Sequence, residues 1–317
     1  MSTGALPPAG SSAEVVRRFE LTLSRRIDGL LLGNHLGRVP GLGSEAGESR
    51  RYMPGDDPRR IDWNVTARTR EPHVRDAVAD REVETWLVVD LSASTDFGTA
   101  RCTKRDLVVT AAGALALLTT RTGDRVGAHV LTSRDVVTLP ARSGPMHARA
   151  ILHRLLVSPR ADGRGADLAA ALEKLARPGG RRGGAVVVSD FPAADGWALP
   201  LRRVAARHET LAIEVLDPRE LALPDVGRLV VVDPETGVER EVDTHDAGLR
   251  QRYAALARAR RGATAAAMRA SAIDHAVLRT DRDATADIVG WLAQRPRRVA
   301  HLRRQRVAAG RGSGAWA

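Results

Sequence analysis

Short apolar runs alternate along this chain with longer segments whose apolar positions recur at helical spacing. Residues 86–89 form one such run, Trp-Leu-Val-Val, and residues 185–188 form another, Ala-Val-Val-Val. Uninterrupted apolar runs of this length are typical of strands that are buried on both faces of a parallel sheet. After the first run in the sequence, residues 104–120 form a long apolar segment that is followed by Gly123, a helix-terminating residue. This pattern predicts a helix at 104–120.

The same reasoning assigns elements to the rest of the chain. Strands are predicted at 125–131, 136–139, 210–216 and 275–278, a β-hairpin at 227–232 and 238–242, and helices at 13–32, 147–156, 166–176, 197–207, 246–270 and 285–293. Strands that alternate with helices imply right-handed βαβ units. The predicted fold class is therefore α/β, with a mostly parallel, doubly wound, Rossmann-like sheet that has helices on both faces.

Each of the two buried runs ends in a carboxylate, and we expect the two runs to be adjacent or near-adjacent central parallel strands whose carboxylates converge at one end. Asp90 follows the first run, with Ser92 and Ser94 close behind it, and Asp190 follows the second. Open α/β sheets bind their ligands at the carboxyl ends of the strands, and Mg²⁺ prefers carboxylate and hydroxyl oxygens. The pattern favours a metal site at this edge of the sheet, while the alternative is that these residues cap the following loops and helices.

Residues 50–68 form a segment in which arginines and aspartates alternate at close range between Tyr52 and Trp63. Its centre, Pro54-Gly55-Asp56, is a turn signal. Charges packed this densely must pair with one another or with a partner. The segment is thus either a salt-bridged turn on the domain surface or a docking surface, with candidate docking residues Arg51, Tyr52, Asp56, Asp57, Arg59, Asp62, Trp63 and Arg68. We expect Tyr52 and Trp63 to pack against the sheet domain, while some of the arginines Arg50, Arg59 and Arg68 pair with Asp56, Asp57 or Asp62.

The sequence motifs in this segment are specific enough to indicate a family. The pattern R-x-Y-x-P-G-D-D-x-R-x-I-D-W, followed by D-x-S-x-S at Asp90, resembles the bacterial family of domains of unknown function numbered fifty-eight. Members of that family carry a von Willebrand factor type A-like domain, and the resemblance extends more loosely from Leu21 to Trp291. It implies a von Willebrand type A-like sheet, to which this chain adds an N-terminal helix, the signature segment and the small hairpin.

The resemblance also implies a metal-ion-dependent adhesion site built by three loops. The residues that it assigns to Mg²⁺ are Asp90, Ser92, Ser94, Asp167 and Asp190. Relatives often carry Gly-Thr-Asp-Leu where this chain has Ala166 in place of the threonine, and a methyl group offers no oxygen to a metal. We therefore expect weak Mg²⁺ binding, with Asp167 or a water in the gap, and Arg164 nearby would repel a cation.

Composition narrows the functional classes. The net charge is +11, and Lys104 and Lys174 are the two lysines among 49 basic residues, so the others are arginines. These arginines are spread along the chain and aromatic residues make up 3% of it, so a nucleic-acid-associated regulator is an alternative interpretation and no more. A metal-dependent hydrolase is the other alternative, although the chain has neither a P-loop nor an H-E-x-x-H motif. We expect a protein that is not an enzyme.

The family resemblance names a kind of partner. Members are often encoded beside MoxR-type AAA+ ATPases and are thought to act with them in chaperone-like assembly or activation of client proteins. It implies an adaptor whose strand-end residues, with or without metal, engage an acidic residue of a client or of the ATPase. Such an adaptor is consistent with a chain that has no nucleotide-binding motif of its own.

Location and domain limits complete the sequence-based expectations. The sequence shows no apolar stretch of spanning length, no secretory signal and one cysteine, Cys102, so a cytoplasmic location is predicted. The expected division is a disordered N-terminus at 1–12, a helix and signature segment at 13–80, the von Willebrand type A-like domain at 81–294 and a basic flexible tail at 295–317.

Overall fold

The computed structural model describes most of the expected elements. The described residues are 12–33, 49–53, 57–58, 61–75, 83–132, 135–160, 167–178, 181–192, 196–234, 236–292 and 294. The predicted tail at 295–317 lies outside these ranges, as does the predicted disordered N-terminus except for Ser12, which begins the first helix. Within the described ranges, none of the helices combines the length and the apolar character that a membrane span requires.

The central sheet has six strands in the order β10-β7-β6-β3-β4-β5. Neighbouring strands pair in parallel, except that β5 runs antiparallel to β4. Counted along the chain, the order from β5 to β10 is 3-2-1-4-5-6, the doubly wound order, so the predicted fold class is confirmed. The bounds are β3 (Glu84–Asp90), β4 (Arg125–Leu131), β5 (Val136–Arg142), β6 (Gly184–Ser189), β7 (Glu209–Leu216) and β10 (Asp274–Arg279).

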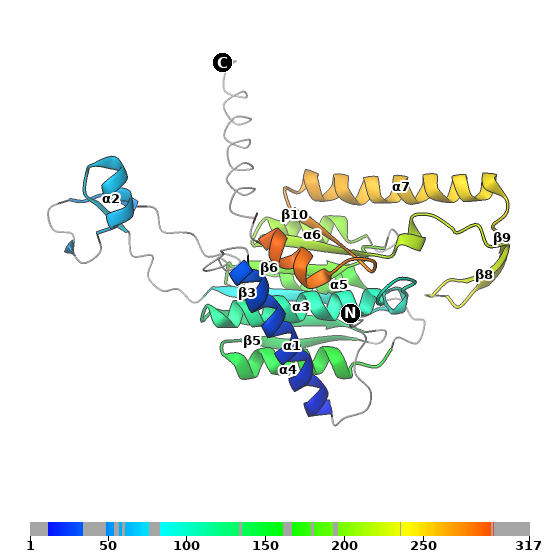
Figure 1. Ribbon diagram of the computed structural model, residues 1–317, viewed down its shortest axis with the longest axis horizontal. Coiled ribbons are helices and arrows are strands. Elements are labelled where there is room, and N and C mark those ends of the chain that lie inside the picture. Colours follow the sequence, from blue (N-terminus) through cyan, green and yellow to red (C-terminus); the bar gives the residue numbers. More distant parts are fainter. Residues whose placement is uncertain are drawn as a thin grey trace, which may run out of the picture.

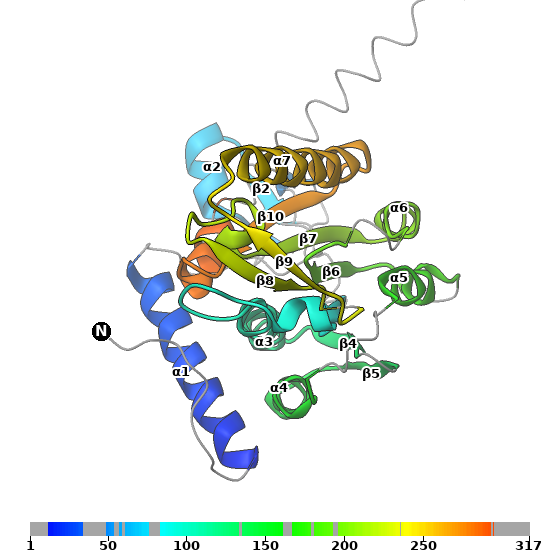
Figure 2. The same ribbon diagram turned by 90° about the vertical axis from the view of Figure 1, so that its right-hand side faces the viewer.

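Helices cover both faces of this sheet, as Figure 1 and Figure 2 show. One face carries α1 (Ser12–Gly33), α3 (Lys104–Arg121), α4 (Pro145–Val157) and a C-terminal helix at 284–292, and the other carries α5 (Leu168–Ala176), α6 (Ala198–Ala205) and α7 (Ala247–Ala270). Alternate residues of β3 divide between two apolar cores: Leu87 and Val89 pack on the α3 side, and Val88 packs on the α5 side. The apolar runs are continuous because the strands are buried on both faces.

The N-terminal helix α1 belongs to the core of the sheet domain. Its apolar stripe, with Val16, Leu23 and Ile27 buried, packs against α3 and α4. An ion pair between Arg149 Nε and Glu20 Oε2, 2.6 Å apart, joins α4 to the same helix. The amphipathic pattern at 13–32 thus marks a helix whose apolar stripe packs on the helices of one face of the sheet.

The predicted hairpin is also present. Strands β8 (Arg228–Val232) and β9 (Glu239–Asp243) pair antiparallel in a separate two-stranded sheet. The segment lies between β7 and α7 in the sequence and projects from the edge of the molecule beside α7 in Figure 1.

Candidate functional site

The strand order reverses between β3 and β6, and such a switch point is where open α/β sheets bind their ligands. These two strands pair in parallel, from Thr85 opposite Gly184 to Val89 opposite Val188. Their last residues therefore lead Asp90 and Asp190 out of the same edge of the sheet. The predicted adjacency of the two buried runs, with their carboxylates at one end, is confirmed.

Asp90 is buried, and both of its carboxylate oxygens accept hydrogen bonds. Oδ1 accepts from the backbone N–H of Ser92 at 2.9 Å, and Oδ2 accepts from Ser189 Oγ at 2.6 Å. The side chain thus joins the end of β3 to the end of β6. Burial, and after it the charge of Asp190, raise the pKa of Asp90 to about 6, although the bonds from Ser189 and Ser92 oppose this rise.

The turn after Asp190 is conformationally unusual. Phe191 has a φ of +50°, in the left-handed region that residues other than glycine adopt at a cost. Ser189 Oγ accepts the Phe191 N–H at 2.9 Å, and the Phe191 ring meets Trp197 edge to face with centroids 5.1 Å apart. Buried packing therefore fixes the backbone that carries Asp190.

Asp190 is paired with a cation that belongs to the chain itself. Lys104 begins α3 with its side chain 1% exposed, and its Nζ lies 2.7 Å from Asp190 Oδ2 and 2.6 Å from Glu220 Oε1. Burial lowers the pKa of Lys104, but Asp190 and Glu220 together raise it above its ordinary value, so the ammonium is charged. We call Asp90, Ser92, Ser94, Lys104, Asp190 and Glu220 the strand-end site.

Glu220 is held in place by a cluster of hydrogen bonds that joins the loops after β3, β7 and β10. Its Oε2 accepts the N–H of Asp217 at 2.9 Å in a capping box at the short 3₁₀ helix η3 (Pro218–Glu220). The buried Asp217 carboxylate accepts from Thr99 N at 2.8 Å and from Thr280 Oγ1 at 2.6 Å. Burial would raise the pKa of Asp217, but these hydrogen bonds lower it below its ordinary value. The loops after β3, β7 and β10 are thereby tied together around Lys104.

The remaining predicted ligands have other roles or lie outside the described residues. The hydroxyls of Ser92 and Ser94 bond each other at 3.1 Å, and Asp167 Oδ1 accepts the Ala170 N–H at 2.8 Å as the N-cap of α5. Asp167 therefore has the helix-capping role that its sequence position also allows. Ala166 and Arg164 fall outside the described residues.

The oxygen donors of the strand-end site do not fit a Mg²⁺ ion, which takes about six oxygens at roughly 2.0–2.1 Å. Both Asp90 oxygens and one Asp190 oxygen already accept hydrogen bonds from the chain, and the hydroxyls of Ser92 and Ser94 bond each other. Among the carboxylate oxygens of these two aspartates, the buried Asp190 Oδ1 is the one without a hydrogen-bond partner. The Lys104 ammonium would repel a divalent cation bound beside it, by roughly 7 kcal/mol at a separation of about 5 Å and an effective dielectric constant of ~20, and this repulsion would offset part of the attraction from the carboxylates. Over the described ranges, no group of three or more His, Cys, Asp or Glu side chains could hold a metal ion. The Mg²⁺ site stays a prediction that this arrangement does not support.

The segment with the Tyr-Met-Pro-Gly-Asp-Asp and Ile-Asp-Trp motifs contains a small folded element that we call the signature unit, residues 49–53, 57–58 and 61–75. Strand β1 (Ser49–Arg51) pairs antiparallel with β2 (His73–Arg75), and α2 (Trp63–Thr69) lies between them in sequence. Asp62 Oδ1 caps α2 by accepting the N–H groups of Asn64 at 3.1 Å and Val65 at 3.3 Å. Figure 1 shows α2 outside the layers of the sheet domain.

The signature unit corrects one expectation. The side chain of Trp63 is 71% exposed, so the prediction that it packs against the sheet domain is wrong. Trp63 is the first residue of α2, and the buried residues among those described in the unit are Asp62 and Val74. Tyr52 is half-buried, Asp57 and Arg68 are exposed, Arg51 pairs with Glu71 at 2.8 Å, and Asp56 and Arg59 lie outside the described residues.

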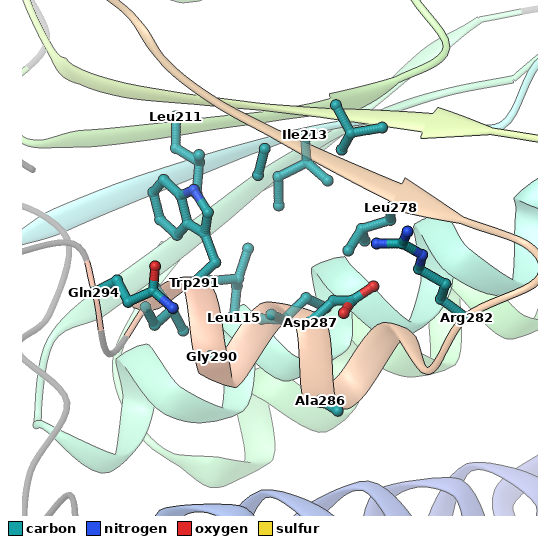
Figure 3. Close-up of a pocket in the computed structure, with 14 residues that line it drawn as sticks. Leu115, Leu211, Ile213, Leu278, Arg282, Ala286, Asp287, Gly290, Trp291 and Gln294 are labelled. Carbon is teal, nitrogen blue, oxygen red and sulfur yellow. The ribbon is translucent and has the colours of Figure 1, made fainter. Parts of the chain in front are cut away.

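A cavity of about 430 Å³ lies elsewhere, between the sheet and the C-terminal helix (Figure 3). Leu211, Ile213 and Leu278 line it from β7 and β10, and Asp287 and Trp291 line it from the helix. Burial raises the pKa of Asp287 above its ordinary value. No predicted ligand and no residue of the strand-end site lines this cavity, so the cavity is a separate feature of the molecule.

Fold and site together define an α/β protein with a doubly wound sheet and an acidic cluster at its switch point, the arrangement expected of a von Willebrand type A-like domain. The family model described as "Protein of unknown function DUF58" matches residues 48–263. The chain belongs to this family. The match includes the signature unit and the strand-end site.

The chain is also similar to individual proteins and solved structures. The chain is 52% identical over 286 residues to Uncharacterized protein Rv1480 of Mycobacterium tuberculosis and, to the same extent, to Uncharacterized protein Mb1516 of Mycobacterium bovis, with 90% of each chain covered. Among solved structures it is similar to BatB from Bacteroides thetaiotaomicron, with 16% identity, a TM-score of 0.41 and coverage of 67% of this chain and 98% of that one. The SpRpn10 VWA domain has 11% identity, a TM-score of 0.37 and coverage of 66% and 94%. Likenesses this distant say nothing about function.

Proposed function

We propose that this chain is a non-enzymatic adaptor that binds other proteins through two surfaces, the signature unit and the loops around the strand-end site. Its partners are a MoxR-type AAA+ ATPase and a client protein whose assembly or activation the ATPase drives. The ATPase is inferred from the family resemblance. It would supply the energy for remodelling, because the chain has no nucleotide-binding motif of its own.

The exposure of Trp63 is the observation that carries this proposal. Trp63 is 71% exposed and Met53 is 64% exposed, and both belong to the small signature unit. Exposing large apolar side chains to water is unfavourable, and tryptophan is enriched among the residues that dominate binding energy at protein interfaces. A folded unit that presents Trp63 to solvent is therefore suited to docking a partner protein.

The hydroxyls of the strand-end site favour binding over catalysis. Ser189 donates to the Asp90 carboxylate, and the hydroxyl of Ser92 pairs with that of Ser94. A nucleophilic serine needs a general base such as histidine within hydrogen-bond reach, and these serines bond other groups. The rim of the site, where Phe97 is 39% exposed, offers contact area to a client.

The signature unit is tested by recovery of the ATPase from extracts of the native host. Tagged wild type, Trp63→Ala and Met146→Ala are compared; Met146 is 70% exposed at the start of α4, so its truncation controls for the loss of an exposed apolar side chain. We expect Trp63→Ala to recover at least about tenfold less ATPase, as for loss of an interface anchor, and Met146→Ala to match wild type. Equal recovery by all three proteins would remove Trp63 from the interface.

The strand-end rim is tested through the client. Asp90 is unsuitable for this test because its replacement also removes two buried hydrogen bonds. Phe97→Ala changes the exposed rim and leaves those bonds in place. We expect it to lower recovery of the client and leave recovery of the ATPase unchanged, and the opposite result would exchange the roles of the two surfaces.

A further inference from the structure

We propose that the ammonium of Lys104 is the resident cation of the strand-end site and that this site works without a metal ion. The proposal concerns the charge balance of the site, so it can be tested on the purified protein without any partner. It stands or falls independently of the adaptor role.

The geometry places the ammonium between two carboxylates. Lys104 Nζ donates to Asp190 Oδ2 at 2.7 Å and to Glu220 Oε1 at 2.6 Å, and the lysine side chain is 1% exposed. A charge buried this deeply persists only when it is paired and hydrogen-bonded. Both carboxylates come from loops at the carboxyl ends of strands, where the family resemblance places a Mg²⁺ ion.

The backbone holds Lys104 in this position. Its own N–H donates to Phe97 O at 2.8 Å, and Thr103 and Asp106 form a capping box at the start of α3. Gly98 makes the loop possible, since a Cβ at this position would meet Cys102 O at 2.5 Å. The ammonium is thus positioned by the same loop that carries Ser92 and Ser94, and the lysine cannot leave the site as a flexible surface side chain could.

Composition adds an independent argument. Lys104 and Lys174 are the two lysines among 49 basic residues of the chain, and Lys174 is exposed. A lysine ammonium is a compact charge with three donors that point in different directions, whereas the guanidinium of arginine is a wide planar fork. In a chain that otherwise uses arginine, lysine stands at the position where a small cation has to fit between two carboxylates.

The inference changes the ligand expected at the site, a consequence that rests on the proposed function. Asp90, Asp190 and Glu220 carry more negative charge than one ammonium neutralises. An open position on Mg²⁺ would attract an acidic residue of a partner. Without the metal, the site attracts hydrogen-bond donors and basic side chains and repels carboxylates.

The first experiment is a metal titration of the intact protein after dialysis against EDTA. We expect calorimetry with MgCl₂ and MnCl₂ to show no binding to wild type, and its melting temperature to change by less than about 1 °C when either salt is added. Saturable binding of either ion, or a clear rise in the melting temperature, would overturn the proposal.

The second experiment removes the ammonium. Lys104→Ala leaves Asp190 and Glu220 without their cation, so we expect a lower melting temperature that Mg²⁺ or Mn²⁺ partly restores, while Lys174→Ala behaves as wild type. A folded Lys104→Ala protein whose melting temperature is unaffected by both ions would show that the lysine does not stand in for a metal.

A measurement on wild type covers the case in which Lys104→Ala does not fold. Reductive methylation followed by peptide mass spectrometry should modify the exposed Lys174 and leave the buried, paired Lys104 unmodified. Methylation of both lysines at similar rates under native conditions would contradict a resident ammonium.

Discussion

The strand-end site and the signature unit both carry family motifs, but they use their residues in opposite ways. At the strand-end site, Asp90 and Lys104 are buried and every described charge has a partner within the chain. In the signature unit, Trp63 is exposed and the Arg51–Glu71 pair lies at the surface. The buried polar groups of the strand-end site bond other groups of the same chain, whereas the signature unit presents large apolar side chains to solvent.

This difference teaches that the specificity of a motif says little about burial. Asp-x-Ser-x-Ser is a weak pattern made of common loop residues, yet Asp90 is buried at the end of a central strand. The longer sequence motifs around Tyr52 and Trp63 are far more specific, yet they belong to a small unit at the periphery. Internal hydrogen bonds and ion pairs restrict residues in one region, and we infer that contact with a partner restricts them in the other.

The largest expected effect contrasts two tryptophans. Trp197 is 7% exposed, packs on Phe191 beside the strand-end site and donates from Nε1 to Pro192 O at 2.9 Å. Trp197→Ala should lower the free energy of unfolding by about 3–5 kcal/mol, as other buried aromatic truncations do. Trp63→Ala should change it by less than about 0.5 kcal/mol. Urea denaturation measures both, and similar losses in the two variants would end the contrast between the regions.

A smaller effect contrasts two glutamates, each changed to its neutral isostere. Glu220 receives the buried Lys104 ammonium, and Glu71 pairs with the exposed Arg51. Glu220→Gln should cost about 2 kcal/mol, since hydrogen bonds to charged groups are worth roughly 1.5–3 kcal/mol. Glu71→Gln should cost less than about 1 kcal/mol, as surface ion pairs do, and salt should reduce that further. The same urea series, repeated at high salt, measures both costs, and a larger loss of stability in Glu71→Gln than in Glu220→Gln would contradict this ranking.

Much of the sheet could be predicted from sequence because its signals are local. Apolar runs at 86–89 and 185–188 reveal strands buried on both faces, and their terminal carboxylates identify the site once the strands are known to pair. The helices followed from the 3.6-residue period of their apolar positions. In the structure, aspartates such as Asp167 and Asp246 cap them. Each of these features depends on residues a few positions apart.

Lys104 could not be predicted because its partners are distant in sequence. Asp190 lies 86 residues away and Glu220 lies 116 residues away, and only the folded sheet brings them together. The available signal was the scarcity of lysine in an arginine-rich chain. Trp63 was misassigned for a related reason, since an aromatic residue at a helix start is buried only if another element covers it.

The pH dependence of stability should also separate the regions. His129 is buried in the sheet, stacked on Trp86 with ring centroids 4.8 Å apart, and burial, followed by the charge of Lys174, lowers its pKa from 6.5 to about 4. The unfolded chain therefore takes up this proton near pH 6.5 and the folded chain only near pH 4. Stability from this group is present above pH 6.5 and is lost as the pH falls through that window.

His129→Gln removes this contribution. Over the window from pH 6.5 to 4.5, the free energy of unfolding of wild type should fall by about 2 kcal/mol more than that of the variant. His73→Gln, in the signature unit, controls for the loss of an imidazole. Parallel pH profiles for wild type and His129→Gln, measured by urea denaturation, would contradict a neutral buried His129.

The smallest expected effect concerns the two helix caps Asp62 and Asp246. Comparing their alanine variants tests whether the signature unit folds separately from the sheet domain. Asp62 caps α2 through Asn64 N and Val65 N, and Asp246 caps α7 through Gly248 N at 2.7 Å. Either aspartate changed to alanine should cost about 1 kcal/mol of local helix stability.

In Asp62→Ala the loss of helix stability should stay within the signature unit. The apolar core on the α3 side of the sheet contains residues of α1, α3 and α4 but no described residue of α2. Amide hydrogen exchange should quicken at 63–69 while exchange in β3 and β6 is unchanged, because low-stability segments open without the rest of the domain. In Asp246→Ala the faster exchange should appear in the first turn of α7 instead. If Asp62→Ala also quickens exchange in β3, then the signature unit supports the sheet, and the exposed Trp63 belongs to a structural element and not to a docking one.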